Sequence, residues 1–213
     1  EACLVGSEMC IRDSPTTALF SGLDSEDMIP LGKNLKYFGD GYQISKRINK
    51  RRFWRIPVMD GEFMCEETTG RVPAIGGGNF LLLAKNRNSC LTACEIAVEI
   101  MSKMDNIITP FPGGVVRSGS KVGSKYKALI ASTNDAFCPS LSGITGSKLS
   151  EDVNCVMEIV INGLTKEDID NGIRESLVAI SKSKYRKDIV SVSAGNYGGK
   201  LGQYQFHLRK ILK

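Results

Sequence analysis

The chain is poor in the residues that most often build catalytic and metal sites. It has one histidine, His207, among 213 residues, and its seven cysteines form no Cys-x-x-Cys pair. A single histidine nearly excludes a Ser-His-Asp triad and a metal site with several histidines. The cysteine spacing favours free, mostly buried thiols of a reducing cytoplasm over zinc ligands or disulfides. We therefore expect a cytoplasmic protein that holds no metal.

Other familiar signatures are missing as well. No apolar run approaches the length that spans a bilayer, and no charged-then-apolar signal region opens the chain, so we expect no membrane partner. The dinucleotide fingerprint Gly-x-Gly-x-x-Gly is absent, and the loop 119–125 lacks the Gly-Lys-Ser/Thr ending of a phosphate loop. These absences disfavour nucleotide-dependent enzymes. The 42% hydrophobic and 24% charged residues are typical of a soluble globular protein.

Positive charge is concentrated in one short segment. The formal net charge is +5, and residues 46–55 hold six basic side chains and no acid. A solvated hairpin or loop is the favoured interpretation of this run. A nucleic-acid footprint and a dock for an anionic ligand tail are the alternatives.

The N-terminal part of the chain shows little regular pattern. Residues 1–14 have no sustained helix or strand period and resemble translated sequencing-adapter read-through, so we expect an artefactual leader outside the fold. The segment from 15 to about 49 is irregular. Beyond it, residues 54–58 and 62–66 are typical of two strands that meet at the strong turn signal Asp60-Gly61.

From residue 79 onward, two strand–helix–strand units follow one another. Apolar patterning predicts strands at 79–85, 107–111, 156–161 and 189–192, and helices at 91–104 and 166–181. Thr92 with Glu95, and Thr165 with Asp168, have the spacing of helix N-terminal caps. The order βαβ–βαβ predicts an α+β, ferredoxin-like fold with two helices on one face of an antiparallel sheet.

The segment between the two units, roughly 112–154, is longer than such a fold needs. Long insertions in compact domains are usually functional or disordered, and the polar and Gly-rich content of this one favours a function. Two of its lysines, Lys121 and Lys125, either hold a carboxylate or phosphate group or are solvated. Its Asn-Asp pair either takes part in a site or forms a polar turn. The candidate residues are Gly113, Gly114, Lys121, Lys125, Asn134 and Asp135.

Glu158 is the sharpest catalytic candidate. It shares one face of its expected strand with Val156 and Val160, and both faces of that strand are otherwise apolar. Burial would raise the pKa of this carboxyl unless a cation or several amides compensate. A carboxylic acid that titrates closer to neutrality is suited to moving a proton. An edge-strand glutamate paired to a lysine is the alternative.

Seven strings of the chain follow one another in a distinctive order. They are Phe38–Gln43, Ile75–Phe80, Pro110–Gly114, Ser120–Lys125, Ala131–Ala136, Glu158–Gly163 and Ser193–Tyr204. In this order they are similar to strings of the formylmethanofuran:tetrahydromethanopterin formyltransferases, and the resemblance extends from about Pro15 to the C-terminus.

The resemblance implies a fold of duplicated ferredoxin-like (βαββαβ) lobes. Residues 15–50 would then be a remnant of the N-terminal lobe and its connection, and residues 51–213 the complete C-terminal, distal lobe. The implied reaction moves a formyl group from formylmethanofuran to N5 of tetrahydromethanopterin, in methanogenesis or methylotrophy. Methanofuran and tetrahydromethanopterin would be carrier substrates, with no bound prosthetic group. The implied partners are further copies in a homo-oligomer, typically a tetramer, or subunits of a formyltransferase/hydrolase complex.

The resemblance also assigns roles to residues. It places the family's acid/base glutamate at Glu158, and it implies that backbone amides of Gly-rich turns stabilise the oxyanion. The anionic tail of methanofuran would meet Lys121, Lys125 or Lys200, and Asn196 completes the expected substrate-binding set. One alternative is a non-catalytic scaffold subunit of a formyltransferase/hydrolase complex. Another is an RNA-binding ferredoxin-like module, which the missing aromatic RNP1 pattern disfavours.

Overall fold

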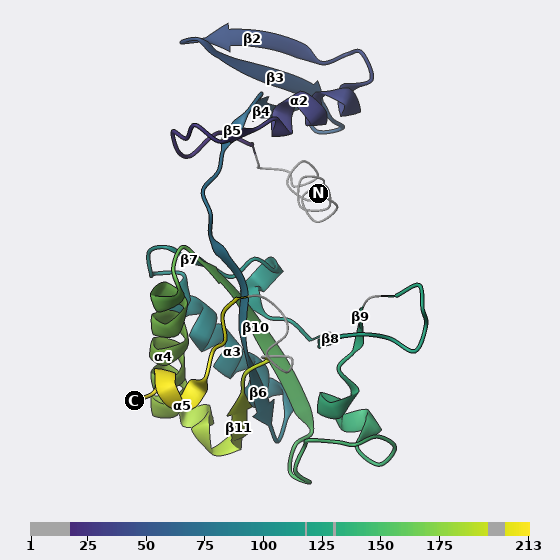
Figure 1. Cartoon of the computed structure of the whole chain (residues 1–213), viewed down its shortest axis with the longest axis vertical. Helices are drawn as coiled ribbons and strands as arrows, with labels where there is room; N and C mark the ends of the chain where they lie inside the picture. The colour runs from purple at the N-terminus through teal and green to yellow at the C-terminus, as the bar shows by residue number, and fades with distance from the viewer. Residues whose placement is uncertain (1–17, 118, 130, 196–202) are drawn as a thin grey trace. The chain divides into compact units, whose positions relative to one another are not determined.

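The computed structural model describes residues 18–117, 119–129, 131–195 and 203–213 (Figure 1). Two compact units make up the chain, Glu1–Pro73 and Ala74–Lys213. The expected leader 1–14 and two expected site residues, Asn196 and Lys200, lie outside the described residues. Within those residues, no helix is both long and apolar enough to cross a membrane.

Unit 1 is built around a three-stranded antiparallel sheet in the order β2-β3-β4. Its strands are β2 (Ile44–Ile48), β3 (Arg51–Pro57) and β4 (Glu62–Glu66), and the last two are the hairpin predicted around Asp60-Gly61. Because β3 pairs with β2 and β4 pairs with β3, residues 51–73 belong to unit 1. The structure therefore divides the chain later than the expected boundary between residues 50 and 51.

Short elements complete unit 1. They are β1 (Met28–Ile29), α2 (Leu31–Leu35), the 3-10 helix η1 (Lys36–Gly39) and β5 (Thr69–Gly70), which pairs with β1. The basic run 46–55 forms the β2–β3 hairpin, whose turn residues Asn49 and Lys50 have positive φ angles. Every residue of β2 is exposed, which agrees with the interpretation of a solvated hairpin.

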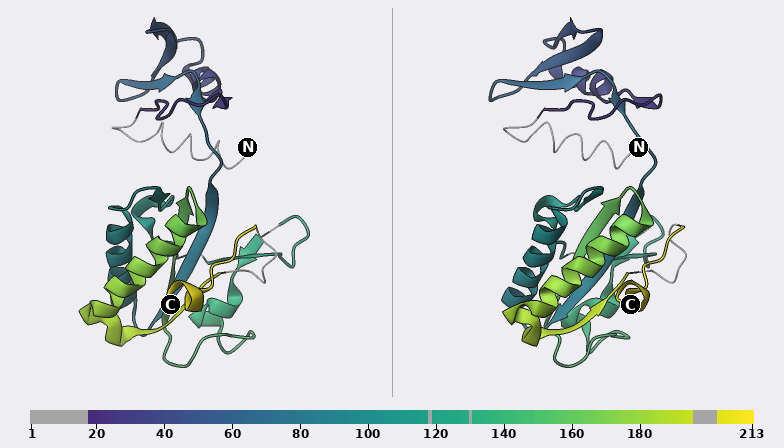
Figure 2. Two further views of the ribbon diagram at one scale, coloured as in Figure 1. Left: turned by 60° about the vertical axis from the view of Figure 1, so that its left-hand side comes forward. Right: turned by 90° about the vertical axis from the view of Figure 1, so that its left-hand side faces the viewer.

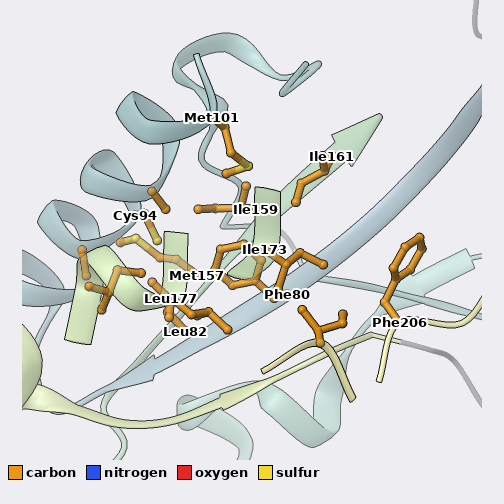
Figure 3. Close-up of a cluster of buried hydrophobic side chains, with 14 of the residues drawn as sticks. Phe80, Leu82, Cys94, Met101, Met157, Ile159, Ile161, Ile173, Leu177 and Phe206 are labelled. Atoms are coloured by element: carbon orange, nitrogen blue, oxygen red, sulfur yellow. The ribbon is translucent and has the colours of Figure 1, made fainter. Parts of the chain in front are cut away.

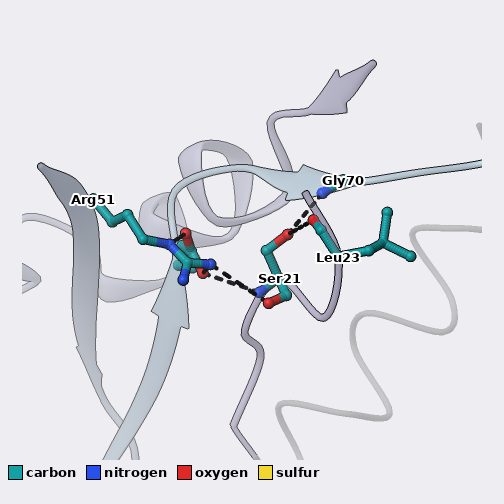
Figure 4. Close-up of polar contacts among 5 residues, drawn as sticks. Ser21, Leu23, Arg51 and Gly70 are labelled. Atoms are coloured by element: carbon teal, nitrogen blue, oxygen red, sulfur yellow. Dashed lines mark hydrogen bonds and ion pairs between the residues drawn. The ribbon is translucent and has the colours of Figure 1, made fainter. Parts of the chain in front are cut away.

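A buried carboxylate joins the strands and loops of unit 1 (Figure 4). Glu66 is 4% exposed, accepts two hydrogen bonds from the Arg51 guanidinium and a third from the Ser21 backbone N–H at 2.9 Å. The Ser21 hydroxyl donates to the Leu23 carbonyl and accepts from the Gly70 N–H. A buried charge is tolerated only when it is paired in this way, so these contacts are structural.

Unit 2 has a four-stranded antiparallel sheet in the order β11-β6-β10-β7 (Figure 1). The strands are β6 (Ile75–Ala84), β7 (Ile107–Ile108), β10 (Cys155–Gly163) and β11 (Ile189–Ser193). Two helices, α3 (Arg87–Met101) and α4 (Lys166–Lys182), lie side by side on one face of this sheet (Figure 2). The chain order is therefore strand–helix–strand twice, which confirms a mixed helix and sheet architecture. A 3-10 turn η5 (Lys184–Asp188) precedes β11, and the short helix α5 (Leu208–Ile211) lies near the C-terminus.

The two helix starts differ in how well the sequence predicted them. The capping box of α4 forms as expected, with the Thr165 hydroxyl accepting from the Asp168 N–H and the Asp168 carboxylate accepting from the Thr165 N–H. In contrast, α3 begins before Thr92, because Asn86 caps it by accepting from the Ser89 N–H at 2.9 Å. Asparagine is as good an N-cap as serine or threonine, so the earlier signal prevails.

The core of unit 2 lies between the sheet and the two helices (Figure 3). Side chains alternate between the faces of a strand, and the helix-facing residues of β6 and β10 are almost fully buried. They are Phe80, Leu82, Met157, Ile159 and Ile161, and they pack against Cys94 and Met101 of α3 and Ile173 and Leu177 of α4. This alternation directs the side chain of Glu158 to the other face of the sheet.

The insertion between the two halves covers part of that other face. It contains η2 (Pro112–Gly114), β8 (Ser120–Val122), β9 (Ala131–Thr133), η3 (Asp135–Phe137) and η4 (Pro139–Leu141). Phe137, Leu149 and Val153 from the insertion pack against Leu81, Leu83 and Val156 of the sheet. The segment therefore shields apolar surface that would otherwise face water, and its edge forms a hollow beside Glu158.

Candidate active site

Glu158 lies in the middle of β10 with both backbone edges paired. It is opposite Leu81 of β6 on one side. On the other side, it exchanges two backbone hydrogen bonds of 2.8 Å with Val116 of the insertion. Only 6% of the residue is exposed. The sheet therefore fixes the backbone beneath this carboxyl, and β10 is not an edge strand as the alternative of an edge-strand glutamate paired to a lysine requires.

One buried side chain holds the carboxyl of Glu158. The Asn79 amide donates from Nδ2 to Glu158 Oε1 at 2.6 Å, and Asn79 Oδ1 accepts from the Gly195 N–H at 2.7 Å. Asn79 is itself 6% exposed. It was not predicted as a site residue, although the sequence carries a signal for it. A single amide on the same strand face as Leu81 and Leu83 is unusual in an otherwise apolar run.

Two effects act on the protonation of Glu158, and they oppose each other. Burial raises the pKa of the carboxyl above its usual value because water no longer solvates the charged form. The hydrogen bond from Asn79 favours the charged form and lowers the pKa, but burial is the larger effect. The net result is a carboxyl whose pKa is raised toward neutrality, which suits both acceptance and donation of a proton.

Glu158 lines a cavity of about 570 Å³. That volume is in the range of small-molecule sites. Its walls come from β6, α3, residues 115–117 and 119, Asn134, residues 137–140, and the start of β10 with Asn154 before it. Two cations line it, Arg87 and Arg117, and sequence reasoning named neither. Arg117 is exposed and makes no ion pair with any residue that the structure describes.

The four predicted polar residues of the insertion fall into three groups. Asn134 lines the cavity with Glu158. Lys121 forms an ion pair with Asp135 across the β8–β9 hairpin, and this pairing holds the pKa of the Asp135 carboxyl below its usual value. The Lys125 ammonium lies 5.6 Å from the centre of the Tyr126 ring. None of Lys121, Lys125 and Asp135 lines this cavity, so only Asn134 of the four is placed beside Glu158.

The predicted Gly113 and Gly114 redirect the chain. Both have positive φ angles, of 68° and 72°, that favour glycine. A Cβ on Gly114 would lie 2.6 Å from Val98 Cγ2, so this glycine also allows close packing on α3. The turn carries the chain from β7 to Val116, which pairs with Glu158. These two glycines do not line the cavity, and their contribution to the site is through the backbone path.

Cysteine chemistry does not add to this site. Cys65, Cys90, Cys94, Cys138 and Cys155 are free thiols, and burial raises the pKa of Cys155 to about 11. Among the described residues, no group of three or more histidine, cysteine, aspartate or glutamate side chains is arranged to hold a metal ion.

Family models match most of the chain. One described as "FTR, proximal lobe" matches residues 61–211, and one described as formylmethanofuran-tetrahydromethanopterin formyltransferase matches residues 5–58. The chain belongs to the formylmethanofuran–tetrahydromethanopterin formyltransferase family. The description of its C-terminal part names a proximal lobe, whereas the sequence expectation used the word distal.

Individual relatives of this formyltransferase family agree. A formylmethanofuran–tetrahydromethanopterin formyltransferase of Methylococcus capsulatus is 60% identical over 203 residues, covering 95% of this chain and 68% of that protein. The formyltransferase/hydrolase complex of Methylorubrum extorquens, crystallised with methylofuran, contains a chain with a TM-score of 0.75 and 45% identity, covering 99% of this chain and 70% of that one. The formylmethanofuran:tetrahydromethanopterin formyltransferase of Methanosarcina barkeri has a TM-score of 0.71 and 42% sequence identity to this chain. The match covers 96% of this chain and 69% of that one.

Proposed function

We propose that this family member moves a formyl group from formylmethanofuran to N5 of tetrahydromethanopterin, with Glu158 as the acid/base. The two carriers are substrates, and the reaction belongs to the one-carbon metabolism of methanogens and methylotrophs. One observation carries the proposal for Glu158. A carboxyl that is 6% exposed, and whose pKa is raised by burial, lines a cavity of about 570 Å³ within the family's matched region.

The reaction needs one proton to change places. The N5 amine attacks the formamide carbon, and a C–N bond forms as the carbonyl oxygen becomes an oxyanion. Ionised Glu158 takes the proton from the attacking nitrogen and then gives it to the nitrogen of methanofuran. The original C–N bond breaks, and the products are the free methanofuran amine and the N5-formyl pterin. Glu158 ends in its starting state, as a catalyst must.

Two Gly-rich loops reach the surroundings of Glu158. Gly119 lines the cavity, and Gly195 binds Asn79 through its backbone N–H. Asn196 and Lys200 follow in the second loop and stay proposed substrate contacts. Backbone amides of these loops are our proposed oxyanion donors, because fixed amides stabilise developing negative charge without reorganisation. Exclusion of water by the insertion would protect the formyl group from hydrolysis.

Binding of the carriers' anionic groups is assigned to the cations that line the cavity. Arg87 and Arg117 replace the expected Lys121, whose ammonium is already paired with Asp135. Arginine is well suited to this because its planar fork binds a carboxylate or phosphate through two hydrogen bonds. Lys125 stays a candidate for the outer part of a tail.

The wider assembly is also part of the proposal. The strand order β11-β6-β10-β7, with α3 and α4 on one face, supports a ferredoxin-like lobe in unit 2, and unit 1 would be the remnant of a duplicated first lobe. A homotetramer in the cytoplasm is the proposed state. Membership in a formyltransferase/hydrolase complex is the alternative, and likeness to the Methylorubrum extorquens complex supports it.

The test is a steady-state assay with formylmethanofuran and tetrahydromethanopterin. Glu158→Gln should lower kcat by roughly 10² or more, the usual scale for general acid–base catalysis. Glu151→Gln is the matched control, because Glu151 is an exposed glutamate of the same unit. Activity of Glu158→Gln within a few-fold of the unsubstituted protein would remove Glu158 from the acid/base role. If the unsubstituted protein is itself inactive in this assay, the result favours the alternative of a non-catalytic scaffold subunit.

A further inference from the structure

The Asn79 side chain connects a Gly-rich loop to the carboxyl of Glu158. Its Oδ1 accepts from the Gly195 N–H at 2.7 Å, and its Nδ2 donates to Glu158 Oε1 at 2.6 Å. Both Asn79 and Glu158 are 6% exposed, so water competes little with either hydrogen bond. Asn79 lies on β6, Glu158 on β10, and Gly195 just after β11. The amide therefore joins three separate segments of unit 2.

The partners of Asn79 determine which way its amide faces. A backbone N–H such as that of Gly195 can only donate, so the oxygen of the Asn79 amide must face it. The NH₂ group then faces Glu158 and can only donate to the carboxyl. Oε1 of Glu158 is consequently held as an acceptor in both protonation states. The remaining oxygen, Oε2, is the one on which a proton can reside.

We propose that Asn79 is a positioning residue that holds Glu158 Oε1 and thereby makes Oε2 the oxygen that exchanges the proton with substrate. The inference rests on the proposed acid/base role of Glu158. A carboxyl without this anchor would rotate and present either oxygen, and fewer encounters would place a proton acceptor at the reacting nitrogen. Asn79 contributes in this way without touching the reacting atoms.

Gly195 is matched to this arrangement by its size. A Cβ at Gly195 would lie 2.6 Å from Asn79 Nδ2 and 2.9 Å from Oδ1, and its nearest neighbours are all atoms of that one side chain. An alanine at 195 must therefore displace the Asn79 amide. The position gives an indirect way to disturb the anchor while Asn79 itself is kept.

Among the described residues, Asn79 is the hydrogen-bond donor to the side-chain carboxyl of Glu158. The charged or titratable groups that line the same cavity are Arg87 from α3, Arg117 from the insertion, and the thiols of Cys138 and Cys155. None of these four described groups donates a hydrogen bond to the carboxyl. Removal of Asn79 should therefore remove the interaction that favours the ionised form.

The experiment compares the pH dependence of kcat/KM in Asn79→Ala, Gly195→Ala and the unsubstituted protein. The ionised carboxyl is the active form, so activity falls as pH drops through the pKa of Glu158. The hydrogen bond from Asn79 is stronger to the ionised carboxyl than to the neutral acid, and this difference corresponds to about one pH unit. The acid limb is the part of the pH profile where kcat/KM falls at low pH. We expect its midpoint to move to a pH about one unit higher in Asn79→Ala, and to move in the same direction by less in Gly195→Ala.

Two matched controls separate this role from general damage. Asn162 accepts a hydrogen bond from the Gly77 N–H at 3.0 Å, as Asn79 does from Gly195, but it does not donate to Glu158. A Cβ on Gly143 would meet nothing within 4 Å. Asn162→Ala and Gly143→Ala should keep the acid limb where it is. Thermal melts show whether each variant is folded. If Asn79→Ala is not folded, the comparison between Gly195→Ala and the unsubstituted protein is the test.

The outcomes distinguish this inference from the proposed function. An acid limb that stays in place in both folded variants, while Glu158→Gln is inactive, overturns the positioning role and leaves Glu158 as the acid/base. A limb that moves equally in the controls also overturns it. High activity of Glu158→Gln refutes the proposed acid/base role of Glu158, whatever the Asn79 variants show.

Discussion

Replacing Glu158 by glutamine should make the protein more stable near neutral pH while it lowers kcat by roughly 10² or more. The side chain is 6% exposed, and burial raises the pKa of its carboxyl in the folded state. Near neutrality the folded protein must therefore accommodate a charge that the unfolded chain solvates freely. Glutamine has the shape of the neutral acid and keeps an oxygen that accepts from Asn79. Such a gain in stability on loss of a catalytic group is a known trade-off.

The sign and pH window follow from proton linkage. Below the ordinary glutamate pKa of 4.5, Glu158 is neutral in both states and the two proteins should be equally stable. As pH rises from 4.5 to the folded-state pKa, the folded form binds more protons than the unfolded form, so this group's contribution to stability falls. Above the folded-state pKa the deficit is constant. It amounts to about 1.4 kcal/mol for each unit by which burial raises the pKa.

Calorimetry between pH 4 and pH 8 measures this difference directly. For a chain of this size, each 1 kcal/mol shifts Tm by about 2–4 °C. Heat capacity is a better probe than tryptophan fluorescence, because the one tryptophan, Trp54, lies in unit 1. Glu151→Gln, at an exposed glutamate, is the control and should show no pH-dependent gain. A Glu158→Gln protein that is less stable at pH 8, or whose difference from the unsubstituted protein is the same at every pH, would refute the reasoning.

Two further predictions concern binding and packing. Arg117→Ala should raise KM for the anionic carriers by about tenfold, or 1.4 kcal/mol. The value of kcat should change little, because Arg117 would bind substrate and transition state equally well. An unchanged KM would exclude Arg117 from carrier binding. Ile159→Ala should lower the free energy of unfolding by about 2–5 kcal/mol, because Ile159 is fully buried between sheet and helices. Ile144→Ala, at a residue that is 81% exposed, should change it by less than about 0.5 kcal/mol. Equal effects of the two isoleucine variants in chemical denaturation would contradict the described core.

Much of the architecture could be predicted from periodicity. The strand β10 and the helix α4 carry clean signals, because strict alternation and a capping box both act over a few residues. The predicted start of α3 is wrong. Thr92 and Glu95 have the spacing of an N-terminal cap, but they lie inside a helix that Asn86 caps upstream of both. A local motif cannot exclude a second motif upstream. The extent of unit 1 depends on the pairing of β2 with β3, which a local pattern does not encode.

Some residues of the candidate site can be predicted from their local sequence, whereas others depend on contacts between distant parts of the chain. Glu158 could be singled out as a candidate because an acid in an apolar strand is anomalous within its own neighbourhood. The partners of the candidate lysines could not, since the pairing of Lys121 with Asp135 depends on how the β8–β9 hairpin aligns. The Asn79–Glu158 hydrogen bond joins residues 79 positions apart, and the approach of Arg117 to the cavity needs the turn at Gly113 and Gly114. Such contacts are set by the fold.

The central claim is that a buried, readily protonated Glu158 carboxyl performs the proton transfer. Infrared difference spectroscopy tests it most directly, because the carboxylic C=O stretch of Glu158 is the band lost in Glu158→Gln. We expect this band to titrate with a midpoint clearly above 4.5, and we expect that midpoint to coincide with the pH at which kcat/KM falls on the acid side. A midpoint at or below 4.5, or one that the activity profile does not follow, would contradict it.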